Sequence, residues 1–234
     1  MTLASAHITI GAAVFDWDGT LIDSRAALLA AWRAATAAVL GRRYPANAEE
    51  EDLVFTLPGA RIWPELVSDP AELPVLAERF QHEYERNAGS VRAFPGVHAM
   101  LASLRSEGIA IGVVTSKARR RYDSDALHSG LAPLVDVAVC AEDARAPKPD
   151  PEPVRIALER LGAEPGRAVM AGDTAVDVKA ARAAGARPLG VAWGHGRPEV
   201  LTAAGAEMVA RNPAELAGAA LRREPLMASC GGGA

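Results

Sequence analysis

Polar side chains suited to catalysis follow four apolar runs of this 234-residue sequence. The first run is followed by two carboxylates one residue apart, the second by two hydroxyl groups, the third by a lysine between prolines, and the fourth by two more carboxylates. These residues are Asp16 and Asp18 in VFDWDGT, Thr115 and Ser116 in VVTSK, Lys148 in APKPDP, and Asp173 and Asp177 in AGDTAVD. If the fold brings them together, they form a site rich in carboxylates that also holds hydroxyl groups and an ammonium group.

The two aspartates of the first motif pose an electrostatic problem that a cation would solve. Their spacing places the side chains of Asp16 and Asp18 on one side of an extended segment, where like charges repel. Mg²⁺ prefers oxygen ligands and usually takes one or two carboxylates, which Asp16 and Asp173 would provide. Phosphoryl transfer also needs a second carboxyl that protonates the leaving group and then deprotonates water, and Asp18 is placed for this role. The residue types therefore predict magnesium-dependent phosphoryl transfer.

The apolar periodicity predicts the elements that position these residues. HITIGAAVF, residues 7–15, is typical of a buried strand, and apolar residues at helical spacing follow Ser24 as far as Gly41. Helical and strand patterns alternate from residue 97 to residue 193, which predicts an α/β fold with a parallel sheet and helical crossovers. Such folds bind ligands at the carboxyl ends of their strands, where the four motifs stand.

The same patterns predict two structural units and a tail. Residues 1–20 and 91–225 are predicted to form the α/β catalytic core. Residues 21–90 show helical patterns broken at Pro58 and Pro64, and they are predicted to form a small all-helical domain inserted after the first strand. Residues 226–234, LMASCGGGA, are predicted to be a flexible tail.

Charge and composition exclude several classes of partner. The chain has 25 basic and 29 acidic residues and a formal net charge of -4, so we expect no nucleic-acid partner. No stretch approaches the roughly 20 apolar residues that span a bilayer, and the N-terminus lacks a secretory pattern, so we expect a cytoplasmic protein without membrane contact. The two cysteines, Cys140 and Cys230, offer neither a disulfide framework nor a zinc site.

The four motifs resemble those of the haloacid dehalogenase superfamily of phosphohydrolases, in particular its phosphoglycolate-phosphatase-like branch. DWDGT, VVTSK, the lysine of PKPDPEP and GDTAVD occur in the order of the family's motifs, and the likeness covers residues 10 to 221. The resemblance implies a Rossmann-like parallel-sheet core with a helical cap inserted after the first motif. It further implies a phosphatase that hydrolyses a small phosphorylated metabolite, phosphoglycolate-like or a sugar phosphate, and that is a monomer or a homodimer.

The resemblance also implies roles for the four aspartates. Asp16 would be the nucleophile that forms an aspartyl phosphate, and Asp18 would be the general acid and base. Mg²⁺ would be held by the Asp16 carboxylate, by the backbone carbonyl of Asp18 and by Asp173. Asp177 would be a further metal ligand or would lie just behind the ligands.

Substrate contacts are implied in the same way. Thr115 and the backbone of Ser116 would bind the phosphoryl group, and Lys148 would balance the charge on the nucleophile and the phosphate. Arg61, in the cap sequence LPGARIW, stands where the family has a substrate-specificity loop, and it is a candidate contact for an anionic leaving group. His195, in WGHG after the last strand, stands close to the predicted site, but a surface or core role is the default for it.

Two other functions are alternatives at this point. Phosphomutases of the β-phosphoglucomutase type carry a cap histidine five residues after the aspartate that closes their first motif. Counted from Asp23, that position is Leu28 here, which disfavours an isomerase. Dehalogenases lack the second acid of the first motif, which is present here as Asp18. Besides the phosphomutase, the second alternative function is that of a catalytically silent binding protein on the same fold.

Overall fold

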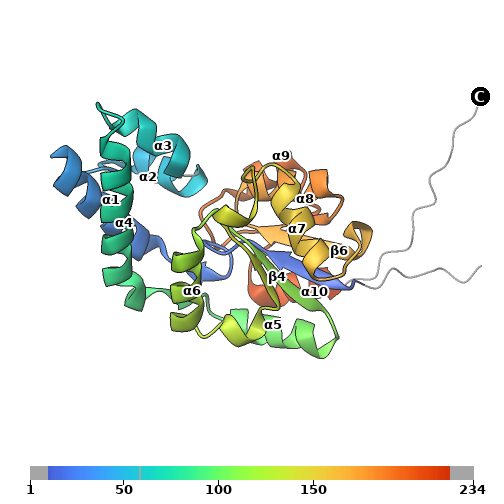
Figure 1. Ribbon diagram of the computed structural model, residues 1–234. Coiled ribbons are helices and arrows are strands. Elements are labelled where there is room, and N and C mark those ends of the chain that lie inside the picture. The colour runs from blue at the N-terminus through green and yellow to red at the C-terminus, as the bar shows by residue number, and fades with distance from the viewer. Residues whose placement is uncertain (1–9, 58, 222–234) are drawn as a thin grey trace, which may run out of the picture.

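A parallel sheet lies at the centre of the computed structural model, which describes residues 10–57 and 59–221 (Figure 1). Within these residues the sheet has six strands in the order β5-β4-β1-β6-β7-β8. The strands are β1 (Ala12–Phe15), β4 (Ala110–Val114), β5 (Val137–Val139), β6 (Ala168–Gly172), β7 (Arg187–Val191) and β8 (Met208–Ala210). Because β1 pairs in parallel with both β4 and β6, the carboxyl ends of these three strands meet at one edge. The predicted α/β fold is confirmed.

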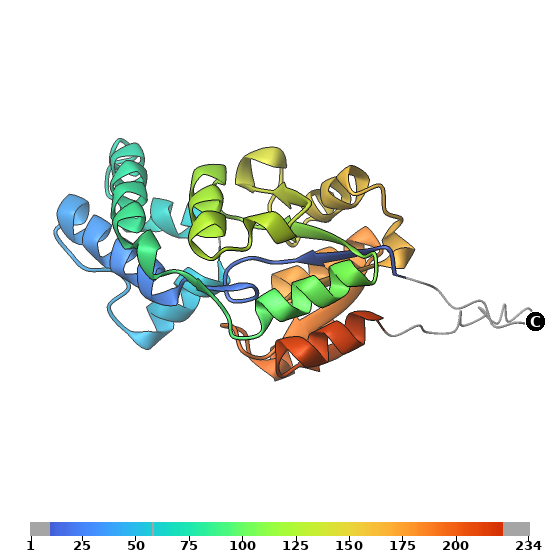
Figure 2. The same cartoon turned by 90° about the horizontal axis from the view of Figure 1, so that it is seen from below.

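Helices cover both faces of the sheet, and strand β1 shows why. Its alternate residues point to opposite faces. Ala13 and Phe15 pack in the apolar cluster that includes α5 (Val97–Ser106) and α10 (Pro213–Leu221). Ala12 and Val14 pack with α7 (Glu152–Arg160) and α8 (Ala175–Ala184) on the other face. All four side chains are fully buried, as expected of an apolar run without alternation. Figure 2 shows the sheet between its two layers of helices.

Four α-helices lie between residues 23 and 92 of the chain, on one side of the sheet in Figure 1. They are α1 (Arg25–Leu40), α2 (Ala48–Thr56), α3 (Gly59–Leu66) and α4 (Glu72–Asn87). The aromatic ring of Trp32 packs against those of Trp63 and Phe80, with 5.4 Å between centroids in each pair. The chain enters and leaves this segment through two short antiparallel strands, β2 (Ile22–Asp23) and β3 (Arg92–Ala93). The division into domains at residues 20 and 91 stays a prediction, and the predicted tail, residues 226–234, lies outside the described residues.

Some elements were not anticipated from the periodicity. Beyond β7 the chain forms α9 (Pro198–Ala204), β8 and α10, and β8 has only three residues, too few for a recognisable alternation. α6 (Arg119–His128) follows β4 as predicted. The break predicted at Pro64 is wrong, because Pro64 lies inside α3. Among the described helices none is both long and apolar enough to cross a membrane.

A carboxylate at the start of β5 joins three elements. The Asp136 carboxylate accepts hydrogen bonds from the backbone N–H of Ile111 in β4, at 2.8 Å, and from Arg105 in α5, at 2.6 Å. Burial opposes the charge of Asp136, but these two donors outweigh it and hold the pKa of this carboxyl below its usual value.

We expect Asp136→Asn to lower the free energy of unfolding near neutral pH, and we expect the loss to shrink in acid. A carboxyl with a lowered folded pKa contributes its stabilisation above the ordinary value of 3.8. That contribution disappears as the pH falls through the folded pKa. Urea unfolding of both proteins from neutral pH to about pH 3 measures the difference. Asp123→Asn, at an exposed position of α6, is the control, and a loss that stays constant with pH would contradict the prediction.

Candidate active site

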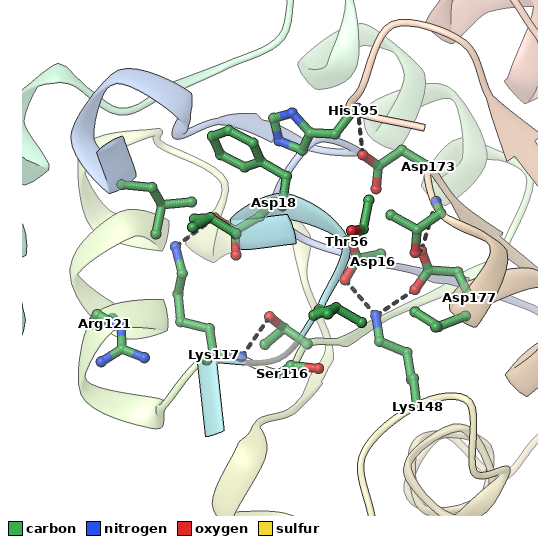
Figure 3. Close-up of a pocket in the computed structure, with 18 of the residues that line it drawn as sticks. Asp16, Asp18, Thr56, Ser116, Lys117, Arg121, Lys148, Asp173, Asp177 and His195 are labelled. Atoms are coloured by element: carbon green, nitrogen blue, oxygen red, sulfur yellow. Dashed lines mark hydrogen bonds and ion pairs between the residues drawn. The ribbon is translucent and has the colours of Figure 1, made fainter. Parts of the chain in front are cut away.

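A pocket opens at the edge where β1, β4 and β6 end (Figure 3). Seven of the eight predicted site residues line it: Asp16, Asp18, Thr115, Ser116, Lys148, Asp173 and Asp177. The opposite wall comes from the helical segment and is mainly apolar, with Leu28, Trp32, Val54, Trp63 and Phe80 among its residues. The strand ends, and the loops and helices that follow them, therefore supply the charged groups, and α1 to α4 supply the apolar surface.

Arg61 is the predicted site residue that the structure does not bring into this pocket. It is exposed on α3, whereas Gly59 and Trp63 of the same helix line the pocket. Residues four apart share a helix face, and a residue midway between them points to the other side. The spacing of α3 thus directs Arg61 away from the pocket.

Three carboxylates gather at the pocket floor. One oxygen from each of Asp16, Asp173 and Asp177 lies within 4.8 Å of the others, and all three side chains are buried. The Nζ of Lys148 lies 2.6 Å from an oxygen of Asp16 and 2.6 Å from one of Asp177, and it also donates to the carbonyl of Val114 at 3.0 Å. This ammonium group therefore bridges the end of β1 and the start of α8.

Backbone geometry holds Asp173 in this cluster. Its Oδ2 accepts the backbone N–H of His195 at 2.7 Å, and its Oδ1 accepts from the hydroxyl of Thr20 at 3.3 Å. Gly19 lies against the same carboxylate with a φ of 79°, and a Cβ at this position would collide with Asp173 and with the His195 ring. The glycine of the DWDGT motif is therefore required by both its conformation and its surroundings.

Charge at the pocket floor is not balanced by the protein alone. Fully ionised, the three carboxylates would exceed the one ammonium group by two negative charges in a buried place. Burial raises the pKa of Asp16 to about 7, with repulsion from Asp177 adding to it and Lys148 opposing it. Burial and the charges of Asp16 and Asp177 also raise the pKa of Asp173. A hard divalent cation bound by these oxygens fits the donor set and supplies the missing charge.

The second aspartate of the motif lies in a different environment. The Asp18 carboxylate accepts hydrogen bonds from Ser24 and from Lys117 Nζ, the latter at 2.7 Å. Although burial opposes ionisation, these contacts hold the pKa of Asp18 below its usual value. Its carboxylate is thus engaged away from the three clustered acids, and the predicted metal contact of its backbone carbonyl stays a prediction.

Lys117 belongs to a buried polar network that sequence analysis missed. Its Nζ contacts Asp18, the Tyr84 hydroxyl at 2.8 Å and the carboxylate of Asp125. The Tyr84 hydroxyl also donates to Asp125 at 2.9 Å, which connects α4 to α6. One feature of the sequence pointed to Lys117: only three of the 25 basic residues are lysines, and Lys117 follows a strand end as Lys148 does.

The turn after β4 presents hydroxyl groups to the pocket. The Oγ1 of Thr115 accepts the backbone N–H of Lys117 at 3.1 Å, which leaves the hydroxyl proton free to donate to a ligand oxygen. Ser116 is exposed at the pocket surface. The His195 ring also lines the pocket and stacks on Phe55 with 4.2 Å between centroids. Burial lowers the pKa of His195, so its ring is neutral at pH 7.

The fold and the site together define an α/β enzyme whose carboxylate centre lies at the carboxyl edge of a parallel sheet and is covered by helices. The chain belongs to the haloacid dehalogenase-like hydrolase family, whose model matches residues 13–191.

Individual relatives extend this likeness over most of the chain. The pyrophosphatase PpaX of Bacillus velezensis is 34% identical over 188 residues, covering 79% of this chain and 84% of its own. The plasmid phosphoglycolate phosphatase of Cupriavidus necator is 33% identical, covering 88% and 90%. A Thermotoga maritima structure, provisionally described as a β-phosphoglucomutase, has a TM-score of 0.73 with 26% identity, covering 90% and 98%.

We expect MgCl₂ to raise the melting temperature, because a cation at the acidic cluster offsets repulsion that exists only in the folded chain. At about a hundredfold excess over the dissociation constant, the gain is about 3 kcal/mol. Differential scanning fluorimetry with and without EDTA measures it. Asp173→Asn should remove most of the rise and Asp123→Asn should retain it. An equal rise in both variants would place the bound cation elsewhere.

Tyr84→Phe should lower the free energy of unfolding by about 1–3 kcal/mol, because it leaves the buried groups of Lys117 and Asp125 one partner short. Denaturant unfolding measures the change. Tyr44→Phe is the matched control, since its ring is also buried and its hydroxyl makes no hydrogen bond within the described part of the chain. Equal effects of the two substitutions would show that the Tyr84 hydroxyl contributes nothing specific.

Proposed function

We propose that this protein is a magnesium-dependent phosphatase that hydrolyses a small phosphorylated metabolite through an aspartyl phosphate on Asp16. The observation that carries this proposal is the position of the Asp16 carboxylate, 2.6 Å from the Lys148 ammonium group and within the cluster formed with Asp173 and Asp177. Membership of a hydrolase family and the likeness to two named phosphatases support it.

In the first half of the reaction, an oxygen of Asp16 attacks phosphorus and the bond from phosphorus to the leaving oxygen breaks. Asp18 acts as the general acid: it must first gain a proton, against the contacts with Lys117 and Ser24 that favour its charged form, and it then gives that proton to the leaving oxygen. Lys148 reduces the repulsion between the Asp16 carboxylate and the incoming phosphate. Thr115 donates its hydroxyl proton to a phosphoryl oxygen.

In the second half, Asp18 takes a proton from water as the water oxygen attacks phosphorus. The bond between phosphorus and the Asp16 oxygen then breaks, which releases inorganic phosphate and restores the carboxylate. Bound magnesium would supply positive charge beside the phosphoryl oxygens, held by Asp16, Asp173 and Asp177. The apolar wall from α1 to α4 excludes bulk water from this chemistry.

A mutase is disfavoured by the residue at one pocket position. Leu28 lines the pocket where the resemblance to β-phosphoglucomutases calls for a histidine. An apolar side chain there can neither donate nor accept a proton, so water is left as the acceptor of the phosphoryl group. Hydrolysis of a compact substrate is therefore the reaction that this pocket favours.

Asp16→Asn should reduce phosphate release from p-nitrophenyl phosphate with magnesium by at least about a thousandfold, since an amide oxygen is a far poorer nucleophile than a carboxylate. A colorimetric phosphate assay measures it, with EDTA in a parallel sample that should also lose activity. Asp123→Asn serves as the matched control on the surface. Full activity of Asp16→Asn would refute the nucleophile, and activity untouched by EDTA would refute the metal dependence.

A further inference from the structure

Arg121 is a charged pocket residue that the proposed reaction does not use. It lies on α6, and it lines the pocket on the side opposite Lys148, Asp173 and Asp177 (Figure 3). Its Nη1 donates to the side-chain oxygen of Gln81 in α4 at 2.8 Å, and its guanidinium carbon lies 5.2 Å from the centroid of the Phe80 ring.

Arg121 differs from Lys117 and Lys148, the two lysines of the pocket, in having no carboxylate partner among the described residues. Lys117 pairs with Asp18 and Asp125, and Lys148 pairs with Asp16 and Asp177. In the part of the chain that the structure describes, the guanidinium of Arg121 makes no ion pair with a carboxylate. Its Nε is buried and has no hydrogen-bond partner there.

The first carboxylate reached from Arg121 through hydrogen bonds already has another cation as its partner. Gln81, which accepts from Arg121, donates in turn to Glu85 at 2.7 Å. Glu85 forms an ion pair with Arg120 at 2.6 Å. Arg121 thus keeps its positive charge in a partly buried place, which is costly unless an anion arrives to share it. Burial lowers the pKa of Arg121, and the more distant charges of Asp18 and Asp125 oppose that shift without cancelling it.

We propose that Arg121 is a specificity-determining residue that binds a second anionic group of the substrate, a carboxylate or a second phosphate carried by the group that leaves. The inference rests on the proposed phosphatase function and names its substrate class. The planar guanidinium presents parallel N–H donors that match either anion. One end of the pocket then holds the reacting phosphoryl group near Asp16 and Thr115, and the other end holds the second anion.

Arg121→Gln tests this subsite on three substrates, each with magnesium. Two of them, 2-phosphoglycolate and pyrophosphate, carry a second anionic group, and 2-hydroxyethyl phosphate carries a neutral hydroxyl group in its place. We expect kcat/KM for at least one of the first two to fall about tenfold or more relative to 2-hydroxyethyl phosphate, mainly through KM. Loss confined to 2-phosphoglycolate supports a carboxylate as the bound group, and loss confined to pyrophosphate supports a second phosphate.

Two further variants separate recognition from structure. Arg120→Gln alters the neighbouring arginine, which is exposed and also contacts α4, and it should leave the substrate ratios unchanged. Arg121→Lys should restore part of the preference because it returns the charge. An equal loss on all three substrates, or no change in the ratios, would overturn the inference while the phosphatase function stands. If the unmodified protein releases phosphate from p-nitrophenyl phosphate but from none of these three, the inference falls and the proposed function stands. If it releases phosphate from none of the four, both fall.

Discussion

Buried negative charge at the carboxyl edge of the sheet is the constraint on which the site depends. Asp16, Asp173 and Asp177 come from two strand ends and the first turn of a helix, and Lys148 offsets only part of their repulsion. The hydrogen bonds from His195 and Thr20, together with the absence of a side chain at Gly19, hold Asp173 in the cluster despite that repulsion. This repulsion lowers the stability of the fold at the place where we propose that a cation and a phosphate bind.

Two lysines divide the acids of the first motif into different environments. Lys148 lies against Asp16 among other carboxylates, and burial raises the pKa of that acid. Lys117 lies against Asp18 with Ser24, and these contacts lower the pKa of the second acid despite its burial. These shifts belong to the site without a cation, and positive charge bound beside Asp16 would lower its pKa and favour the ionised carboxylate that a nucleophile needs. The connection from Lys117 through Tyr84 to α4 also links the helical segment to the motif.

Much of the fold was predictable because its signals are local. Apolar runs and helical spacing predicted β1, β4, β5, β6 and β7 and the helices between them, but not the short strands β2 and β3. Strand ends predicted seven pocket residues. The sequence pattern missed β8, which has only three residues, and it wrongly placed a helix break at Pro64, which lies inside α3. It also named Arg61, which lies outside the pocket, and did not consider Arg121, because a side chain's direction depends on how its helix packs.

The sequence by itself determined which chemical groups stand at the strand ends, because spacing along an extended chain and strand order follow from local pattern and from the rules of parallel sheets. The tertiary structure alone decided how those groups are paired. Lys117 lies 99 positions from Asp18 in the chain, and Lys148 lies 132 positions from Asp16. Such pairings depend on which elements pack together. The position of Arg121 depends on the same packing: it lies where α6 meets α4 and has no carboxylate partner among the described residues. Ion pairing is a property of distance in space, which local pattern does not specify.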